Sequence, residues 1–180
     1  MSIYNAEFFA GRSETVALSV VHAVPPIVEL LHPKSVLDVG CGQGEWTFGF
    51  MAAGVEDVIG VDIYPPDLMW FMRRDLTEPL HLKRWFDLVL CLEVGEHLPA
   101  DTADTLVDSL VRHGDRVVFS AAVPGQEGKG HINCQPHDYW HAKFEERGYR
   151  TLDTLRPLLQ DHRVSAWYRN NMFLYERDGR

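Results

Sequence analysis

The sequence predicts an α/β fold in which a mostly parallel, doubly wound sheet carries helices on both faces. Short strand-like runs alternate with helix-like runs along the chain, a pattern typical of parallel sheets whose crossovers are helical. Two strand-like runs, "FDLVLCL" and "RVVFSA", are almost continuously apolar, as expected of strands buried on both faces. A glycine-rich stretch, "VGCGQG", follows the first strand-like run, at the edge where folds of this class bind ligands.

Seven strands and four longer helices are expected in turn. The strands are predicted over Ser35–Val39, Asp57–Asp62, Phe71–Arg74, Phe86–Leu92, Arg116–Ala121, Tyr149–Leu155 and Met172–Glu176. The helices are predicted over Glu14–Leu31, Glu45–Ala53, Ala100–His113 and Pro136–Arg147. The pair Pro25-Pro26 predicts a break in the first helix, because proline has no amide hydrogen and its ring clashes with the preceding turn.

The second and third strands are unusually close in the sequence. Twelve residues separate Asp62 from Asp75, and Pro65 and Pro66 are among them. A crossover between parallel strands usually contains a helix and needs about a dozen residues or more. We therefore expect a short or missing helix here, which would expose one edge of a ligand pocket.

Length and composition are those of an ordinary globular protein. The 180 residues are 46% apolar and 24% charged, enough for one compact domain with a core, and we expect a single domain over residues 1–180. The net charge of −9 argues against a nucleic-acid partner, because phosphate binding needs a concentrated positive surface.

Targeting signals are not evident, and we expect a cytoplasmic protein with no membrane partner. The N-terminus does not read as a signal peptide. We find no apolar run that approaches the roughly 20 residues needed to span a bilayer. The three cysteines form no CxxC pair, which fits a reducing compartment.

Glycine stands at three alternate positions, Gly40, Gly42 and Gly44, directly after the first predicted strand. Glycine weakens strands and helices by about 0.5–1 kcal/mol relative to alanine, so three together indicate a turn on which a ligand lies against bare backbone. The spacing is GxGxG, with Glu45 where a dinucleotide-binding pattern has its third glycine, so no pyrophosphate is required at the helix start. Asp62 ends the second strand, where a carboxylate accepts hydrogen bonds from ribose hydroxyls. The pattern predicts an adenosine-type ligand, with a plain tight turn and a solvated strand end as the alternatives.

Four segments in this order, "VLDVGCGQGEW", "VIGVDI", "RRDLTEPL" and "FDLVLCLEVGEHLP", resemble the class I S-adenosylmethionine-dependent methyltransferases, in particular their small-molecule branch. The resemblance covers nearly the whole chain, from Tyr4 to Glu176. It implies a Rossmann-like, seven-stranded sheet whose last strand, Asn171–Arg177, is antiparallel, and a helical lid over residues 1–32 on a core of residues 33–180. It also implies S-adenosyl-L-methionine as cofactor and methyl transfer to oxygen, nitrogen or carbon of a small-molecule acceptor.

The resemblance implies roles for individual residues of the cofactor site. Asp38 would help to hold the ammonium group, Asp62 the ribose hydroxyls, and Asp75 with the Leu76 amide the adenine, although Asp75 could instead cap a helix. Glu93 would line the pocket near the sulfonium, or be a surface charge. The full cofactor-binding set comprises Asp38, Gly40, Cys41, Gly42, Gly44, Trp46, Asp62, Ile63, Asp75, Leu76, Leu92, Glu93 and His97.

The acceptor is expected to meet the segment "GQEGKGHINCQPHDYWH", because glycine-rich loops after a strand often carry function. His131 is the first choice for a general base or acceptor orienter, and His97 is the second catalytic candidate; either could be a purely structural histidine. The candidate substrate residues are Tyr4, Phe8, His131, Asn133, Tyr139 and Arg169. Tyr139 could equally anchor a helix, and Arg169 could cap a turn.

Zinc-type ligands recur in this segment, at His131, Cys134, His137 and His141. The preceding glycines and the resemblance to an acceptor loop favour the other interpretation, and we expect no bound metal. A homodimer is possible. The alternatives to a small-molecule enzyme are a nucleic-acid or protein methyltransferase, and a cofactor-binding protein with a non-methylating role.

Overall fold

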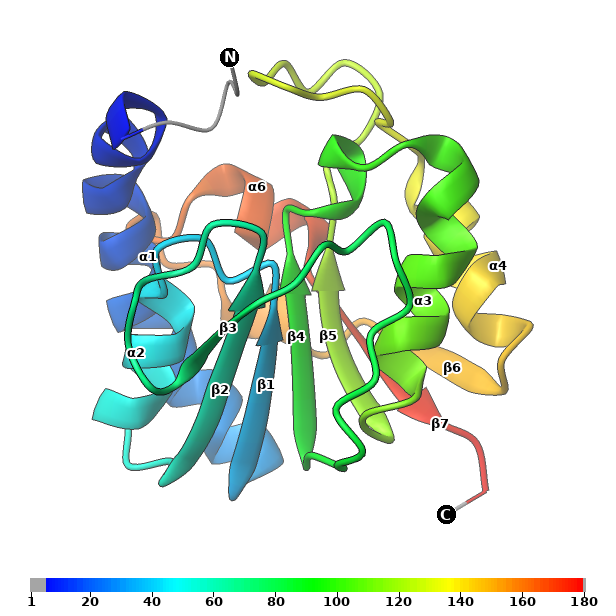
Figure 1. The fold of residues 1–180 in the computed structure, drawn as a ribbon, viewed down its shortest axis with the longest axis horizontal. Helices are drawn as coiled ribbons and strands as arrows, with labels where there is room; N and C mark the ends of the chain where they lie inside the picture. Colours follow the sequence, from blue (N-terminus) through cyan, green and yellow to red (C-terminus); the bar gives the residue numbers. More distant parts are fainter. Residues whose placement is uncertain (1–5, 180) are drawn as a thin grey trace.

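A computed structural model describes the backbone of residues 6–179 and the side chains of residues 14–179. Seven strands form one sheet in the order β3-β2-β1-β4-β5-β7-β6 (Figure 1). The strands are β1 (Ser35–Val39), β2 (Asp57–Asp62), β3 (Phe71–Arg73), β4 (Leu88–Leu92), β5 (Arg116–Ser120), β6 (Tyr149–Leu152) and β7 (Phe173–Arg177). Strand β7 is antiparallel to both of its neighbours, β5 and β6, and the other neighbouring pairs are parallel. The predicted fold class and the antiparallel last strand are confirmed.

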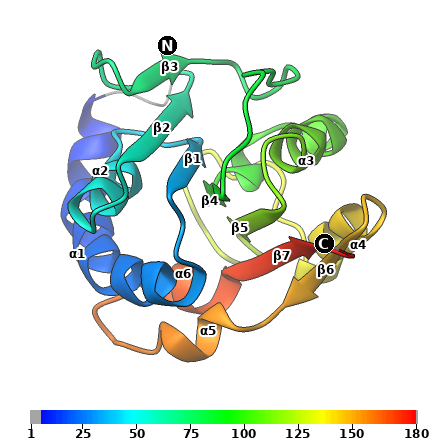
Figure 2. The same cartoon turned by 90° about the horizontal axis from the view of Figure 1, so that it is seen from below.

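Helices cover both faces of the sheet, as Figure 2 shows from below. On one face lie α1 (Ala6–Leu31), α2 (Glu45–Ala52), α5 (Leu155–Leu158) and α6 (Ala166–Asn171), and on the other lie α3 (Ala103–Val111) and α4 (His137–Glu145). Two short 3-10 turns, η1 (Gly95–His97) and η2 (Ala100–Thr102), precede α3. Alternate residues of each central strand enter different cores: Leu88 and Leu90 pack under α1 and α2, whereas Val89 packs under α3 and α4.

Helix α1 runs without interruption through Pro25 and Pro26, so the predicted break is wrong. Pro25 is exposed and Pro26 is only partly buried, whereas Ala23 and Ile27 on the inner face are fully buried. The carbonyl groups that lose a helical partner therefore lie toward solvent, where water replaces it, while packing on the inner face continues.

The stretch Glu14–Leu31 of α1 has a mean hydropathy of 1.4 and could cross a membrane by length and composition alone. The sequence analysis did not recognise this stretch. In the structure, Val20, Val24 and Ile27 of the same stretch pack into the core beneath the sheet. A core helix passes the same test of length and composition, and we draw no conclusion about a membrane from it.

The connection between β2 and β3 contains no helix, which confirms the trimmed crossover. Helix α6 was not predicted; a turn was offered there only as the alternative role of Arg169. Its start follows Ser165, whose backbone is extended as expected of a residue that precedes a helix. Helix α6 matters for the site, because it brings Tyr168 to the same edge of the sheet as the glycine turn.

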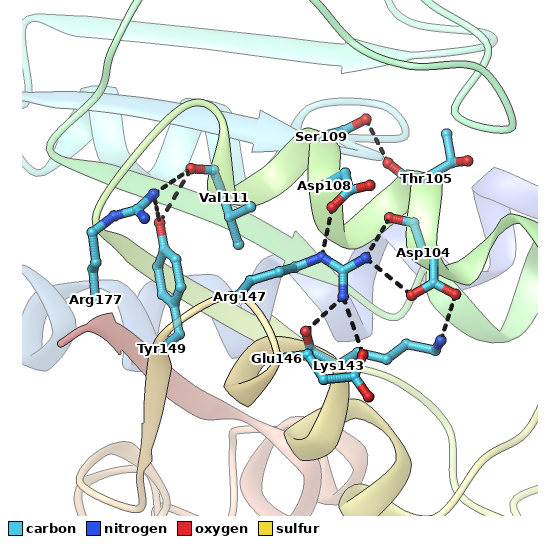
Figure 3. A network of polar contacts seen from close by, with 10 residues as sticks. All are labelled: Asp104, Thr105, Asp108, Ser109, Val111, Lys143, Glu146, Arg147, Tyr149 and Arg177. Atoms are coloured by element: carbon cyan, nitrogen blue, oxygen red, sulfur yellow. Dashed lines mark hydrogen bonds and ion pairs between the residues drawn. The ribbon is translucent and has the colours of Figure 1, made fainter.

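An ion-pair network joins α3 to the end of α4 (Figure 3). Arg147 donates from Nε to Asp108 at 2.6 Å and from Nη2 to Asp104 at 3.0 Å, and Lys143 donates to Asp104 at 2.8 Å. Asp104 and Asp108 thus meet at one guanidinium group, and Asp104 also binds Lys143. This network fixes the helical layer that lies under the loop carrying the predicted acceptor residues.

Candidate cofactor and acceptor site

A cavity of about 420 Å³ opens at the carboxyl ends of β1, β2 and β4, where open α/β sheets bind ligands. Eleven of the thirteen predicted cofactor residues line it: Gly40, Cys41, Gly42, Trp46, Asp62, Ile63, Asp75, Leu76, Leu92, Glu93 and His97. The other two, Asp38 and Gly44, lie outside the lining. Residues that come together from four separate segments of the sequence thus form one pocket.

The glycine turn is held against the end of β2. The backbone amides of Gly40 and Cys41 both donate to the carbonyl of Val61, at 2.8 and 3.1 Å. Gly40 has a φ of +78° and Gly44 a φ of +89°, the left-handed region in which side chains are strained.

Close packing adds a second reason for glycine at both ends of this turn. A Cβ on Gly40 would lie 2.3 Å from a methyl carbon of Val94, and one on Gly44 would lie 2.4 Å from the Phe71 ring. Gly44 does not line the cavity, so its glycine serves the packing of the turn on β3. The lining residues Gly40 and Gly42 are the ones that expose backbone to a ligand.

Asp62 holds the loop and faces the cavity at once. Its Oδ2 accepts the amide of Gly42 at 3.0 Å, and its Oδ1 accepts the amide of Tyr64 at 2.9 Å. A carboxylate oxygen has a second lone pair, so both oxygens can still accept hydrogen bonds from a vicinal diol. The loop amides therefore hold the carboxylate in one orientation at the cavity.

Asp38 is buried beneath the glycine turn. Its Oδ2 accepts a hydrogen bond from the Thr47 hydroxyl at 2.7 Å. Burial raises the pKa of Asp38 to about 7, with the negative charge of Asp62 adding to the shift and the Thr47 hydrogen bond opposing it. Asp38 therefore titrates near neutral pH, and it lies behind the residues that line the cavity.

Asp75 lines the cavity and also closes a turn. Its Oδ1 accepts from the amide of Thr77 at 3.0 Å and from the Thr77 hydroxyl at 2.7 Å. These two bonds hold the pKa of the Asp75 carboxyl below its usual value. Asp75 therefore caps a turn over residues 75–78 and not the helix of the alternative interpretation, and it lines the pocket as well.

Glu93 has a φ of +55°, a conformation that costs a residue other than glycine about 1–3 kcal/mol. Its amide donates to the carbonyl of Ser120 at 2.9 Å, and its Oε2 accepts from Nε2 of Gln126 at 3.0 Å. Gln126 in turn accepts at Oε1 from Nδ2 of Asn171, at 2.8 Å. The pocket side of β4 is thereby connected to the acceptor loop and to α6, and the alternative of a solvated surface charge is excluded for Glu93.

His97 and His131 are neighbours, but only His97 lines the cavity. Their ring centroids lie 4.9 Å apart with an interplanar angle of 76°. Nδ1 of His131 lies 3.0 Å from the carbonyl oxygen of Gln126, and the ring packs behind His97. Of the two predicted catalytic residues, His97 is the one placed to meet a ligand.

Of the remaining predicted acceptor residues, the three whose side chains the structure describes lie outside the cavity lining: Asn133, Tyr139 and Arg169. Asn133 is buried and donates from Nδ2 to the carbonyl of Gly95 at 3.2 Å, so it clamps the loop onto η1. Tyr139 packs edge-on against Trp140, as an anchor of α4. Arg169 lies in α6. Tyr4 and the side chain of Phe8 lie outside the described residues.

The four zinc-type residues of the sequence do not come together. Nε2 of His137 lies 3.2 Å from the amide oxygen of Asn171, and Nδ1 of His141 lies 2.8 Å from the Tyr175 hydroxyl. His131 instead belongs to a different group, with Glu96 and His97.

Sequence reasoning missed Tyr168, which lines the cavity from α6. Its hydroxyl accepts a hydrogen bond from Nε1 of Trp46 at 3.3 Å, and the two rings meet edge to face. Val16 of α1 also lines the pocket. Neither residue belongs to a local motif, so no short pattern could have located it.

Comparisons with known proteins agree with this geometry. A family model described as a methyltransferase domain matches residues 12–120. A tRNA U34 carboxymethyltransferase from Pseudomonas savastanoi pv. phaseolicola is 37% identical over 112 residues, covering 53% of this chain and 35% of that protein. The chain therefore spans about a third of the length of the curated relatives that it matches.

Solved structures share the fold at low identity. The sugar N-methyltransferase KedS8 from Streptoalloteichus sp ATCC 53650 has a TM-score of 0.70 and 19% identity, over 98% of this chain and 96% of that one. The glycopeptide N-methyltransferase MtfA, in complex with S-adenosyl-L-methionine, has a TM-score of 0.60 and 16% identity, over 88% and 92%. Since the family model matches more than half of the chain, the protein belongs to the methyltransferase-domain family.

Proposed function

We propose that the protein transfers the methyl group of S-adenosylmethionine to an oxygen, nitrogen or carbon atom of a small molecule. The observation that carries the proposal is the pocket itself. Bare backbone at Gly40 and Gly42 and the carboxylates of Asp62 and Asp75 share one cavity with polar side chains after β4.

The cofactor would lie with its ribose on Asp62 and its adenine by Asp75 and the Leu76 amide. Its methionine part would follow the glycine turn, with the ammonium group toward Asp38, through water because Asp38 is not in the lining. The sulfonium would then point toward Leu92, Glu93 and His97. Val16 supports a covering role for α1, since it lines the cavity from that helix.

Methyl transfer needs an acceptor atom aligned with the carbon–sulfur bond, and alignment alone supplies much of the rate. His97 is proposed to orient the acceptor, because it lines the cavity beyond Glu93. His131 would act behind it, as a positioning residue.

Charge and neighbouring proteins support a small acceptor. The net charge of −9 disfavours a polyanion. The solved neighbours KedS8 and MtfA are a sugar N-methyltransferase and a glycopeptide N-methyltransferase. Their shared fold does not carry their substrates over to this chain, but their named acceptors support the choice of a small molecule as the first candidate.

The second candidate acceptor is tRNA, because the curated relatives include tRNA U34 carboxymethyltransferases. The match covers only 35% of that relative, so the rest of that protein has no counterpart in this alignment. A tRNA enzyme would need positive surface for many phosphates, and this acidic chain would have to supply it locally.

One experiment separates the two. The purified protein is incubated with S-adenosylmethionine labelled in the methyl group, and separately offered unmodified bulk tRNA and a panel of amino sugars, phenols and carboxylic acids. Transfer to a small molecule, with release of S-adenosylhomocysteine, supports the proposal. Transfer to tRNA alone contradicts it. A His97→Ala variant that still binds S-adenosylhomocysteine should lose turnover with the acceptor found.

A further inference from the structure

A buried carboxylate and two imidazoles meet beside the cofactor pocket, and His131 is their one member that also belongs to the zinc-type pattern of the sequence. Glu96 and His97 come from the 3-10 turn η1, and His131 comes from the loop after β5. One ligand atom from each lies within 4.8 Å of the other two, and Nε2 of His131 lies 4.0 Å from Oε1 of Glu96. We propose that these three residues bind one divalent transition-metal ion.

Hydrogen bonds at Nδ1 of both imidazole rings favour the neutral tautomer in which Nε2 is free to bind a metal ion. Nδ1 of His97 lies 3.1 Å from the carbonyl oxygen of Gly130, and Nδ1 of His131 lies 3.0 Å from that of Gln126. A carbonyl oxygen only accepts, so each Nδ1 carries the hydrogen and each Nε2 carries the lone pair. Metal-binding histidines in proteins are fixed in this way by a backbone carbonyl.

The two segments that carry the ligands are tied together. The amides of Ile132 and Asn133 both donate to the carbonyl of Glu96, at 2.9 and 3.0 Å. The Asn133 side chain donates to the carbonyl of Gly95 at 3.2 Å. The loop is thus held on η1 by backbone and side-chain bonds that do not involve the ligand atoms, so the three ligands are arranged before an ion enters.

The burial of the Glu96 carboxylate favours the binding of a cation next to it. The Glu96 side chain is fully buried, and the His131 side chain is 9% exposed. A carboxylate removed from water is stabilised by positive charge close to it, and a divalent ion supplies two units. The carboxyl oxygen and imidazole nitrogens would draw together by roughly an ångström, because metal bonds to such atoms are about 2.0–2.2 Å long.

Two imidazoles and one carboxylate suit zinc and other first-row transition ions, and leave a position open for an exogenous ligand. A magnesium ion prefers oxygen ligands and keeps its waters, so it fits this set poorly. His97 also lines the cofactor cavity, which places the ion at the edge of that cavity.

The test is metal binding alone, measured by calorimetry on the full chain after chelator treatment, with zinc, manganese(II) and magnesium as probes. We expect one zinc or manganese ion per chain with micromolar or tighter affinity, and no heat from magnesium at the same concentration. His131→Ala and Glu96→Gln should each weaken binding on the order of 10- to 100-fold or more. His137→Gln and His141→Gln, which alter the zinc-type pattern of the sequence at residues whose partners are Asn171 and Tyr175, should bind as the wild type does.

Folding is monitored in each variant by circular dichroism and by S-adenosylhomocysteine binding. The proposal fails if neither zinc nor manganese binds stoichiometrically, if only magnesium binds, if folded His131→Ala binds as tightly as the wild type, or if His141→Gln abolishes binding. No acceptor is needed for the measurement, so its failure would leave the proposed methyl transfer standing, and the reverse is also true.

Discussion

Replacing Asp62 by alanine is expected to weaken the binding of S-adenosylhomocysteine by about 10- to 100-fold. In the structure, the carboxylate accepts the amides of Gly42 and Tyr64 and has a free lone pair on each oxygen for the ribose diol. Hydrogen bonds to a charged group contribute roughly 1.5–3 kcal/mol, which corresponds to that range of affinity.

The same substitution also releases the loop, so the stability of the variant must be measured separately. Without the carboxylate, the amides of Gly42 and Tyr64 lose their hydrogen-bond acceptor at a partly buried site. This should lower the free energy of unfolding by about 1–3 kcal/mol, or the melting temperature by roughly 2–12 °C. Asp62→Asn keeps one acceptor oxygen without the charge and should fall between wild type and alanine in affinity.

Calorimetric titration with S-adenosylhomocysteine measures the effect directly. Asp57→Ala is the matched control, because Asp57 begins the same strand at its opposite end and pairs with Arg84. Its removal changes the net charge equally and should leave the affinity within about twofold. An Asp62→Ala variant that is folded and binds as tightly as the wild type would refute the assignment of Asp62 to the ribose.

Three further outcomes follow from the geometry. Gly44→Ala should lower the melting temperature more than Gly54→Ala. Both glycines have φ near +90°, but a Cβ at Gly44 would lie 2.4 Å from a side-chain atom, whereas a Cβ at Gly54 would meet nothing within 4 Å. Equal shifts in the melting temperature would show that the packing around Gly44 does not matter. The affinity for S-adenosylhomocysteine should rise about eightfold from pH 6 to pH 7.5, because Asp38, with its raised pKa of about 7, becomes ionised opposite the ammonium group. Asp38→Asn should remove this rise. A variant with the same pH profile as the wild type would contradict the assignment of Asp38 to the ammonium group. Tyr168→Phe removes the acceptor of the Trp46 indole hydrogen bond and should destabilise the fold by about 1–3 kcal/mol, measured by urea denaturation; a change below about 0.5 kcal/mol would mean that this bond contributes little.

The fold was accessible from the sequence because its signals are local. The strand Ser35–Val39 was predicted with the bounds it has in the structure, and Asp57–Asp62 likewise, since each apolar run ends at a turn residue. The same locality explains the error at Pro25, where the rule for an isolated helix overlooks that the inner face of α1 packs on the sheet. Tertiary packing overrode a local preference there.

The cofactor side of the site was predictable for a related reason. Asp62 and Gly42 occupy the ends of neighbouring parallel strands, and the topology alone brings those ends to one edge. Asp38 was predicted less well by this reasoning. It lies near the same edge of the sheet, but Thr47 of α2 covers its carboxyl group. Membership of the motif therefore did not predict whether the side chain reaches the pocket.

The acceptor side depends on contacts between segments far apart in the sequence. His131 was singled out by its neighbours in a polar loop, whereas its position is set by the amide of Asn133, which binds η1, and by Gln126. In the structure His131 meets Glu96 and His97 as well as Cys134, but not the two histidines that follow. Spacing within one segment did not reveal Glu96 and His97 as its neighbours, because they lie on another segment.

The backbone of Glu93 explains why these two halves of the site act together. Its left-handed conformation costs about 1–3 kcal/mol, and glycine in that place would avoid this cost. What glycine could not provide is the carboxylate that accepts from Gln126, the residue whose carbonyl fixes the ring of His131. One strained residue at the end of β4 thus faces the cofactor cavity and, through Gln126, reaches the loop that orients His131. We expect Glu93→Gly to relieve the strain and to lose the bond to Gln126 that connects the cavity to the loop of His131.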